Sequence, residues 1–419
     1  MSDAMTSDAL TTPAAAAEAT HDTGTAYGLR LGGPLNDLAQ VGPGTPFGEV
    51  LRRYWHPISK VEKVTTTPRR VKVLGEELIL FRTGRGVPSL LHPRCIHRGA
   101  SLYYGGVEED GIRCCYHGWL FDPQGHCLEQ PCEPDLGRHR DKVRQPWYPV
   151  QERYGLVWAY MGPADKKPVL PRYDVFEDVP EGRHLIVNDA GVGGGGPEVL
   201  DFNWLQHWEN VMDPFHVPIL HARFSGEQFT PEMGVIPEVT FEYTPVGVSS
   251  TQIRVLDGRR ALRRRTEVMF PNLRVVPSPR LTPGQTNLIG WVVPEDDTAF
   301  RIFTLAVHED PDFLAKLRST FGGKRWAELT EEEHRRMPGD YEAQKSQGPI
   351  SLHSEDHLTT TDQGVAMLRR LMAKQVRAVA AGQDPVGVIR DPADEVVTIT
   401  GGNFFLDEEE AVAEGLVDA

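Results

Sequence analysis

Residues 113–119 read RCCYHGW and place two adjacent cysteines and a histidine within one short stretch of chain. A second Cys–His pair precedes them at residues 95–99, which read CIHRG. Thiolate sulfurs bind zinc ions and iron–sulfur clusters, and imidazole nitrogens bind zinc and iron, so two such loops predict a metal centre. The spacing alone leaves both metals open. It also does not say whether Cys114 or Cys115 is the ligand.

The cysteine distribution favours a metal over disulfide bonds. The chain has five cysteines, all between positions 95 and 132. The N-terminal residues lack the basic start and apolar core of a secretory signal, and an odd cysteine count argues against a disulfide framework. We therefore expect a cytoplasmic protein with a clustered metal site.

The charge balance argues against nucleic-acid binding, and the distribution of apolar residues argues against a membrane span. Of 419 residues, 40% are hydrophobic and 25% are charged, as in globular proteins. Acidic residues exceed basic ones by 59 to 44, which disfavours nucleic-acid binding because phosphate needs clustered positive charge. The sequence has no apolar run of about 18 residues, so we expect no membrane span.

The pattern along the chain predicts an α+β protein with two domains. Residues 1–29 are small and polar and predict a disordered tail. Residues 30–161 open with a short helical pattern and then alternate β-branched runs with glycine turns, as in an antiparallel β domain. Residues 162–405 begin with a proline-rich linker and then combine helices with a second β segment. Residues 406–419 read as a solvated acidic tail.

A second group of candidate ligands has the form D-x-x-H-x-x-x-x-H, at Asp213, His216 and His221. On an ideal α-helix Asp213 and His216 share a face, whereas a spacing of five turns His221 about 140° away from His216. Pro218 should break or kink the helix and can redirect His221. Convergence of the two histidines is plausible, but periodicity alone does not require it.

Both motifs resemble those of one family. CIHRG and CCYHGWLFD are similar to the two cluster-binding loops of Rieske ring-hydroxylating oxygenases, and residues 44–58 and 73–83 resemble the phthalate dioxygenase-like branch. The segment containing His216 and His221 resembles the mononuclear iron motif of the same family. The resemblance covers most of residues 30–405 and implies a β Rieske domain followed by a helix-grip catalytic domain, an antiparallel sheet flanked by helices.

The resemblance also assigns roles to the residues of the first motif. It implies a Rieske [2Fe–2S] cluster with the second loop as Cys-x-x-His, and therefore these four ligands: Cys95, His97, Cys114 and His117. Tyr116 and Trp119 are expected to pack over the cluster. Three cysteines remain as small, partly buried hydrophobic residues: Cys115, Cys127 and Cys132.

For the second motif the resemblance implies a non-haem Fe(II) site with two His ligands and one carboxylate. The ligands are then His216, His221 and a downstream acid, for which we favour Asp340. A helix N-cap is the alternative role of Asp340. Glu355 and Asp356 are rival ligands. Asp362 is expected only to cap the following helix.

Asp213 is implied to be a bridge rather than a ligand. In the family, the acid three residues before the first His accepts N–H groups from an iron-binding His of its own subunit and a cluster-binding His of a neighbour. This role requires a head-to-tail oligomer, so we expect a homotrimer or a higher homo-oligomer.

The implied protein is a terminal oxygenase component that hydroxylates, dihydroxylates or dealkylates an aromatic substrate, such as an aryl carboxylate. The run Gly191-Val192-Gly193-Gly194-Gly195-Gly196 formally matches a dinucleotide fingerprint, but no βαβ pattern surrounds it, so we interpret it as a loop. Electrons from NAD(P)H must then arrive through a separate reductase or ferredoxin. The basic run at residues 263–265 consists of Arg263, Arg264 and Arg265. It could hold a carboxylate, although we favour a solvated strand or loop.

Two other classes of protein compete with this interpretation. A Rieske ferredoxin that only carries electrons would end near residue 160. A zinc-stabilised binding module would have no catalytic activity. The long second half and its separate His motif favour the oxygenase.

Overall fold

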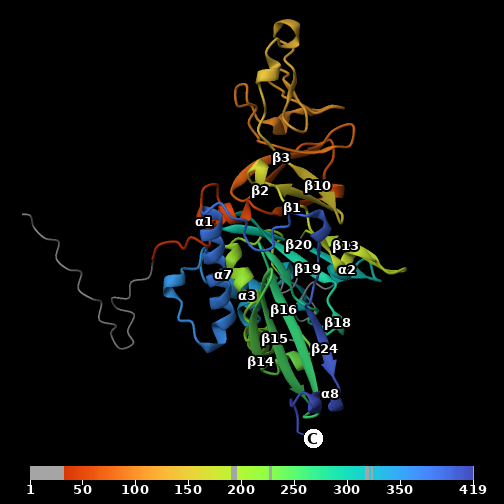
Figure 1. Ribbon diagram of the computed structural model, residues 1–419, viewed down its shortest axis with the longest axis vertical. Helices are drawn as coiled ribbons and strands as arrows, with labels where there is room; N and C mark the ends of the chain where they lie inside the picture. The colour runs from red at the N-terminus through yellow and green to blue at the C-terminus, as the bar shows by residue number, and fades with distance from the viewer. Residues whose placement is uncertain (1–32, 190–195, 226–228, 317–319, 322–323, 419) are drawn as a thin grey trace, which may run out of the picture.

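The computed structural model describes residues 33–189, 196–225, 229–316, 320–321 and 324–418. The predicted N-terminal tail, 1–29, lies outside these residues, as do positions 191–195 of the glycine run. Figure 1 shows an elongated molecule with a small β-rich tip at one end and a large sheet forming most of the rest.

The first half of the chain is built from antiparallel strands, as the sequence predicts. Helix α1 (Pro46–Leu51) leads into a three-stranded sheet in the order β1-β11-β10 and a four-stranded sheet in the order β2-β3-β4-β9. A further four-stranded sheet, β5-β6-β7-β8, carries the tip in Figure 1. The strands are β1 (Trp55–Lys60), β2 (Arg69–Val73), β3 (Glu76–Arg82), β4 (Pro88–Leu91), β5 (Gly106–Val107), β6 (Ile112–Arg113), β7 (Leu120–Phe121), β8 (Cys127–Glu129), β9 (Trp147–Tyr148), β10 (Val150–Arg153) and β11 (Leu156–Tyr160).

The second half is organised around a nine-stranded antiparallel sheet, with main order β13-β20-β19-β17-β16-β15-β14. Strand β24 returns from near the C-terminus to pair with β16 and β18. The strands are β13 (His184–Asn188), β14 (Glu238–Thr244), β15 (Gly247–Leu256), β16 (Arg260–Met269), β17 (Leu273–Val275), β18 (Gly284–Gln285), β19 (Leu288–Asp296), β20 (Ala299–His308) and β24 (Gly402–Leu406). Two short pairs are separate from this sheet: β12 (Arg172–Tyr173) with β23 (Val396–Val397), and β21 (Thr320–Phe321) with β22 (Lys324–Arg325).

Helices flank this sheet, which confirms the predicted α+β class. Helix α7 buries Val365, Leu368, Met372 and Val379 at the expected helical spacing. Asp362 occupies its N-cap position, but the Asp362 side chain accepts hydrogen bonds from Thr359 instead of capping α7. The helices are α2 (Asp174–Glu177), α3 (Trp204–Val211), α4 (Phe313–Lys316), α5 (Glu331–Arg336), α6 (Asp340–Lys345), α7 (Gln363–Ala380), α8 (Glu408–Ala413) and the π-helix η6 (Val217–Phe224).

The hydrophobic core runs without a break between the two halves. Trp158 on β11 meets Trp291 on β19 edge to face, with ring centroids 5.1 Å apart. The proline-rich segment after residue 162 packs into this core through Tyr173 and Phe176. The boundary at residue 162 therefore stays a prediction.

The acidic C-terminal segment is not the solvated tail expected from its charge. Ala411 of α8 is fully buried, and Leu416 and Val417 pack on the same cluster. The apolar residues among the acids explain this packing.

Candidate metal centres

The two Cys–His loops have the same backbone geometry. In the first, the Cys95 N–H donates to the Ala100 carbonyl at 2.8 Å and the Gly99 N–H donates to the Cys95 carbonyl at 2.8 Å. Gly99 has φ +75°, a value that favours glycine because it has no Cβ.

The second loop repeats this pattern. Cys114 donates to the Trp119 carbonyl at 2.8 Å, Gly118 donates to the Cys114 carbonyl at 3.0 Å, and Gly118 has φ +73°. Cys114 thus occupies the position equivalent to Cys95. Cys115 lies one residue further along and is exposed.

The four expected cluster ligands lie in one region of the tip. Cys95 and Cys114 are both buried, and the rings of His97 and His117 have centroids 4.6 Å apart. Burial raises the pKa of the Cys95 thiol to about 12, with the Cys114 thiol acting in the same direction. A cation must therefore stabilise the thiolate form, which fits two buried thiols that hold iron.

The neighbouring aromatic residues differ in their exposure. Trp119 stacks on His97 with ring centroids 4.3 Å apart and an interplanar angle of 3°. The Tyr116 ring lies 3.8 Å from that of His117 but is 57% exposed. Trp119 therefore covers a ligand as expected, whereas Tyr116 contacts one and still faces solvent.

The expectation for the remaining cysteines was partly wrong. Cys127 is buried beside Phe121, as expected for a small hydrophobic residue. Cys115 and Cys132 are exposed, because each lies on a loop outside the small core of the tip.

The second candidate centre brings together His216, His221 and Asp340, which are far apart in sequence. Their potential ligand atoms all lie within 4.8 Å of one another. The Asp340 Oδ1 atom is 3.2 Å from His221 Nε2 and 3.7 Å from His216 Nε2. His221 is buried, whereas the side chains of His216 and Asp340 are 18% and 22% exposed, so this donor set borders solvent on one side. Two imidazoles and a carboxylate fit a divalent iron ion.

The π-helix explains how two histidines five residues apart converge. Helix α3 ends at Val211, and η6 begins at Val217 with His216 as its N-cap. In a π-helix the backbone bonds join residues five apart, so His216 and His221 lie about one turn from each other. Pro218 does not break this helix, contrary to expectation, because it occupies the first turn, where no N–H is required.

Asp213 shapes the turn before His216. Its Oδ1 atom accepts the Phe215 N–H at 2.9 Å and the His216 N–H at 3.3 Å. His216 Nδ1 lies 2.5 Å from the Asp213 carbonyl oxygen and 3.5 Å from its carboxylate. With Nδ1–H donated to this carbonyl, His216 presents Nε2 to Asp340.

The electrostatics of the group suit a cation. Burial alone raises the pKa of the Asp340 carboxyl, but His221, His216 and His207 outweigh it and hold the pKa well below its usual range. For Asp213, burial likewise opposes ionisation, and His216 lowers the net pKa. Both side chains are therefore carboxylates near neutral pH.

The rival ligands lie elsewhere. Asp356 forms an ion pair with Arg369 at 2.7 Å, and Glu355 lies in a short helical turn outside the three-residue group. Asp340 is not a helix N-cap, which was the alternative role. Gly339 occupies the N-cap position of α6, and Asp340 is the first residue of the helix.

The basic run of β16 is not a solvated strand throughout. Arg264 is buried and donates to Asn403 and to two main-chain carbonyls, whereas Arg263 pairs with Glu414. Arg265 pairs with Glu242 and Glu267. Pairing with β24, which the local pattern of β16 does not reveal, covers this stretch.

Three further residues beside the His–His–Asp group were not predicted from the sequence: His207, Asn210 and Arg274. Asn210 Nδ2 lies 3.5 Å from Asp340 Oδ1, and His207 and Arg274 interact electrostatically with Asp340. The helical spacing of His207 and Asn210 on α3 is the one sequence signal that could have indicated a shared face.

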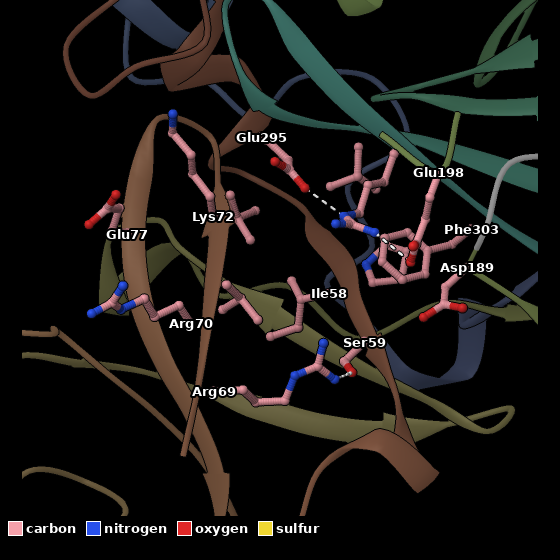
Figure 2. A pocket seen from close by; sticks show the side chains of 15 residues that line it. Ile58, Ser59, Arg69, Arg70, Lys72, Glu77, Asp189, Glu198, Glu295 and Phe303 are labelled. Atoms are coloured by element: carbon pink, nitrogen blue, oxygen red, sulfur yellow. Dashed lines mark hydrogen bonds and ion pairs between the residues drawn. The ribbon is translucent and has the colours of Figure 1, made fainter. Parts of the chain in front are cut away.

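A charged hollow of ≈ 240 Å³ lies between the β1–β2 region and β19–β20. Figure 2 shows Glu295 and Glu198 directed at one guanidinium. Arg301 forms ion pairs with both, at 2.5 Å to Glu295 and 3.0 Å to Glu198. Arg69 donates to Ser59 in the same hollow. These groups therefore pair within each half of the protein, Arg69 with Ser59 in the first and Arg301 with the two glutamates in the second.

Comparisons with known proteins identify the family of this chain. The model of the Rieske [2Fe-2S] domain family matches residues 54–145. Phenoxybenzoate dioxygenase subunit alpha of Ectopseudomonas oleovorans is 50% identical over 386 residues, 91% of this chain and 94% of that protein. The phthalate 4,5-dioxygenase oxygenase subunit of Pseudomonas putida is 29% identical over 397 residues, 84% of this chain and 87% of that protein.

The solved structure of NdmA from Pseudomonas putida CBB5 has the same fold, with a TM-score of 0.58 at 19% identity, over 80% of this chain and 94% of that one. In the part of the chain that the structure describes, no helix is both long and apolar enough to cross a bilayer. Identity of 50% across nearly the whole length assigns the family: the chain belongs to the Rieske oxygenases, as a large oxygenase subunit.

Proposed function

We propose that Cys95, His97, Cys114 and His117 hold the [2Fe–2S] cluster, and that His216, His221 and Asp340 hold a mononuclear iron ion. The observation that carries this proposal is the convergence of His216, His221 and Asp340 from segments more than a hundred residues apart, with His221 buried. When bound, the cluster supplies single electrons and the mononuclear iron supplies a site for O₂ activation.

Metal analysis of single variants tests this assignment. Asp340→Ala should lose the mononuclear iron and keep the EPR signal of the cluster, whereas Cys114→Ser should lose the cluster. Zinc in place of iron, with no visible absorption, would contradict the proposal and favour a zinc-stabilised module.

We infer that Asp213 connects the two centres across a subunit contact. Asp213 borders an open hollow of ≈ 420 Å³. Its lining also includes four acids, of which the first two pair with Arg369 in the same hollow: Glu209, Asp356, Glu355 and Asp362. The exposed rim of the cluster tip carries Arg98 and Tyr116, so an acidic hollow and a tip with a basic residue complement each other. This complementarity supports a head-to-tail homotrimer.

A mixed oligomer tests this arrangement. Cys114→Ser subunits should be inactive alone, and Asp213→Asn subunits should be about 10- to 100-fold slower than the wild type. Activity should recover when the two are refolded or co-expressed together, because some contacts then join an intact tip to an intact Asp213. Failure of mixed trimers to recover, or a monomer in analytical ultracentrifugation, contradicts the arrangement.

The proposed substrate is an aryl carboxylate, and the electrons come from NAD(P)H through a separate reductase or ferredoxin. Two relatives support this substrate class, because they are named as a phenoxybenzoate dioxygenase and a phthalate dioxygenase. The experiment is product formation from aryl carboxylates with O₂, NADH and a surrogate reductase. Product formed only from uncharged aryl compounds would contradict the substrate class and leave the oxygenase assignment intact.

A further inference from the structure

Helices α3 and α6 face each other at two points beside the His–His–Asp group. Asn210 of α3 approaches Asp340 of α6, and His207 of α3 approaches Gln344 of α6. Asp340 and Gln344 are four residues apart and share one face of α6. The surroundings of His207 and Gln344 are therefore the immediate neighbourhood of the proposed iron site.

Hydrogen bonding fixes the state of His207. Arg274 Nη1, which can only donate, lies 3.3 Å from His207 Nε2, so Nε2 accepts and Nδ1 carries the proton. His207 Nδ1 then donates to Gln344 Oε1 at 3.0 Å. Burial lowers the pKa of His207 to about 3, with the Arg274 charge acting in the same direction, which agrees with a neutral ring.

This arrangement leaves hydrogen-bond donors without acceptors. Gln344 directs its oxygen at His207, and its Nε2 amide is buried without a hydrogen-bond partner among the described residues. The hydroxyl of Thr304 is also buried without one, and Thr304 is 0% exposed. A buried donor without an acceptor is destabilising, so the pair indicates a ligand that accepts hydrogen bonds.

Strand register brings Thr304 and Arg274 to the same place. Gly290 of β19 lies opposite Arg274 of β17 on one side and Thr304 of β20 on the other. A Cβ atom at Gly290 would lie 3.2 Å from Arg274 Nε and 3.3 Å from Thr304 Oγ1. The two polar groups therefore converge beside Gly290, where the Phe303 carbonyl oxygen also lies 3.2 Å from the Cβ position.

Arg274 supplies positive charge at this point. Burial lowers the pKa of its guanidinium to about 10, against the opposing effect of Asp340, so the group stays charged at neutral pH. The Arg274 side chain nevertheless keeps some solvent access, unlike Leu273 and Val275 on either side. A charged guanidinium, a hydroxyl and an amide together match the acceptor oxygens of a carboxylate.

We propose that Arg274, Thr304 and Gln344 bind the carboxylate of the substrate and so orient its ring beside the mononuclear iron. The inference rests on the proposed function and names the residues that select a charged substrate. Gly290 takes part because it has no side chain that would crowd Arg274 and Thr304.

Binding to the iron-loaded protein without reductant or O₂ tests this site separately from turnover. Isothermal titration calorimetry compares phenoxybenzoate with uncharged phenoxybenzamide. The wild type should prefer the carboxylate, and Arg274→Gln should weaken carboxylate binding about 10- to 100-fold, the effect of losing a charged hydrogen bond. Binding of the amide should change little. Arg274→Lys should recover part of the preference.

Arg263→Gln is the matched control, because Arg263 forms a surface ion pair with Glu414 on the same sheet. Thr304→Val keeps the side-chain shape, so it should preserve folding and weaken carboxylate binding. Gly290→Ala should also weaken carboxylate binding, because the new Cβ would crowd Arg274 Nε and Thr304 Oγ1. If Thr304 were only structural, the Val variant would bind both probes like the wild type.

The proposal is overturned if the wild type binds the two probes equally, binds neither, or keeps its preference in Arg274→Gln. Iron content and the cluster spectrum of each variant separate these outcomes from failure of the metal sites. Intact metal centres with no carboxylate preference leave the oxygenase assignment standing and remove only the carboxylate site.

Discussion

His216 Nδ1 lies 2.5 Å from the main-chain carbonyl oxygen of Asp213, whereas the Asp213 carboxylate is 3.5 Å away and one-third exposed. The carbonyl therefore orients the ring, and the carboxylate keeps capacity to accept a further N–H group. The carbonyl can therefore bind His216 of its own subunit while the carboxylate accepts a hydrogen bond from a neighbouring subunit, as the proposed bridge requires.

Asp213→Asn should keep both metals and slow product formation about 10- to 100-fold, the usual effect of removing such a supporting carboxylate. The ring stays oriented because the Asp213 carbonyl is unchanged. Single-turnover product formation by the pre-reduced protein measures the effect. Asp362→Asn, in the same hollow, is the control and should react at the wild-type rate.

Asp340→Asn should weaken iron binding more than Asp356→Asn. The Asp340 carboxylate supplies the negative charge of the donor set, whereas Asp356 is engaged with Arg369. Iron content after dialysis against a chelator measures this difference, with the cluster absorbance as the internal reference. Equal iron loss in both variants would falsify the choice of Asp340.

How far the sequence predicted these centres depends on whether the determining contacts are local. The Cys–His loops are local, because each closes its own backbone bonds between a cysteine and the glycine four residues later. The amphipathic spacing of α7 is local as well. Both predictions were confirmed at the level of fold class and family.

The arrangement around His216 depended on contacts that helical periodicity does not describe. A 3.6-residue period separates His216 from His221, and only the π-helix realigns them. Asp340 joins them from a distant helix, so its approach depends on how α6 packs against α3. Similarly, the burial of Arg264 depends on β24, which lies far along the chain. Such long-range pairings leave no periodic signal near the residue itself.

The two adjacent cysteines should differ in their effect on the cluster. Cys115→Ala should keep the visible and EPR spectra of the wild type, because Cys115 is exposed and lies one position beyond the equivalent of Cys95. Cys114→Ala should lose them. A variant lacking Cys115 that also loses the spectrum would show that the loop uses the second cysteine.

The two loop glycines form a second matched pair. Gly99 and Gly118 both have positive φ, so alanine at either position introduces strain of about 1–2 kcal/mol. At Gly118 the new Cβ would also lie 2.7 Å from Pro131 Cγ, whereas at Gly99 it meets nothing within 4 Å. Thermal bleaching of the cluster should therefore begin at a lower temperature in Gly118→Ala than in Gly99→Ala. Equal bleaching temperatures would show that Pro131 moves aside without loss of stability.

His56 should make the protein sensitive to acid through its position between the two halves. It is fully buried on β1, where its Nε2–H donates to the Leu51 carbonyl at 2.8 Å and its Nδ1 accepts from Asn272 at 3.3 Å. Burial lowers the pKa of His56 from 6.5 to about 4, and the nearby Arg52 charge acts in the same direction. The ring is therefore neutral in the folded protein at neutral pH.

As the pH falls from 6.5 towards 4, the unfolded chain binds a proton at His56 that the folded protein does not, so the free energy of unfolding decreases. The pKa difference corresponds to a loss of about 3 kcal/mol. His56→Gln keeps a donor and an acceptor but does not titrate, so its urea midpoint should fall less between pH 7.5 and 4.5. Other acid-sensitive groups affect the wild type and His56→Gln alike. If the urea midpoints of the two proteins fall in parallel with pH, His56 becomes protonated without unfolding.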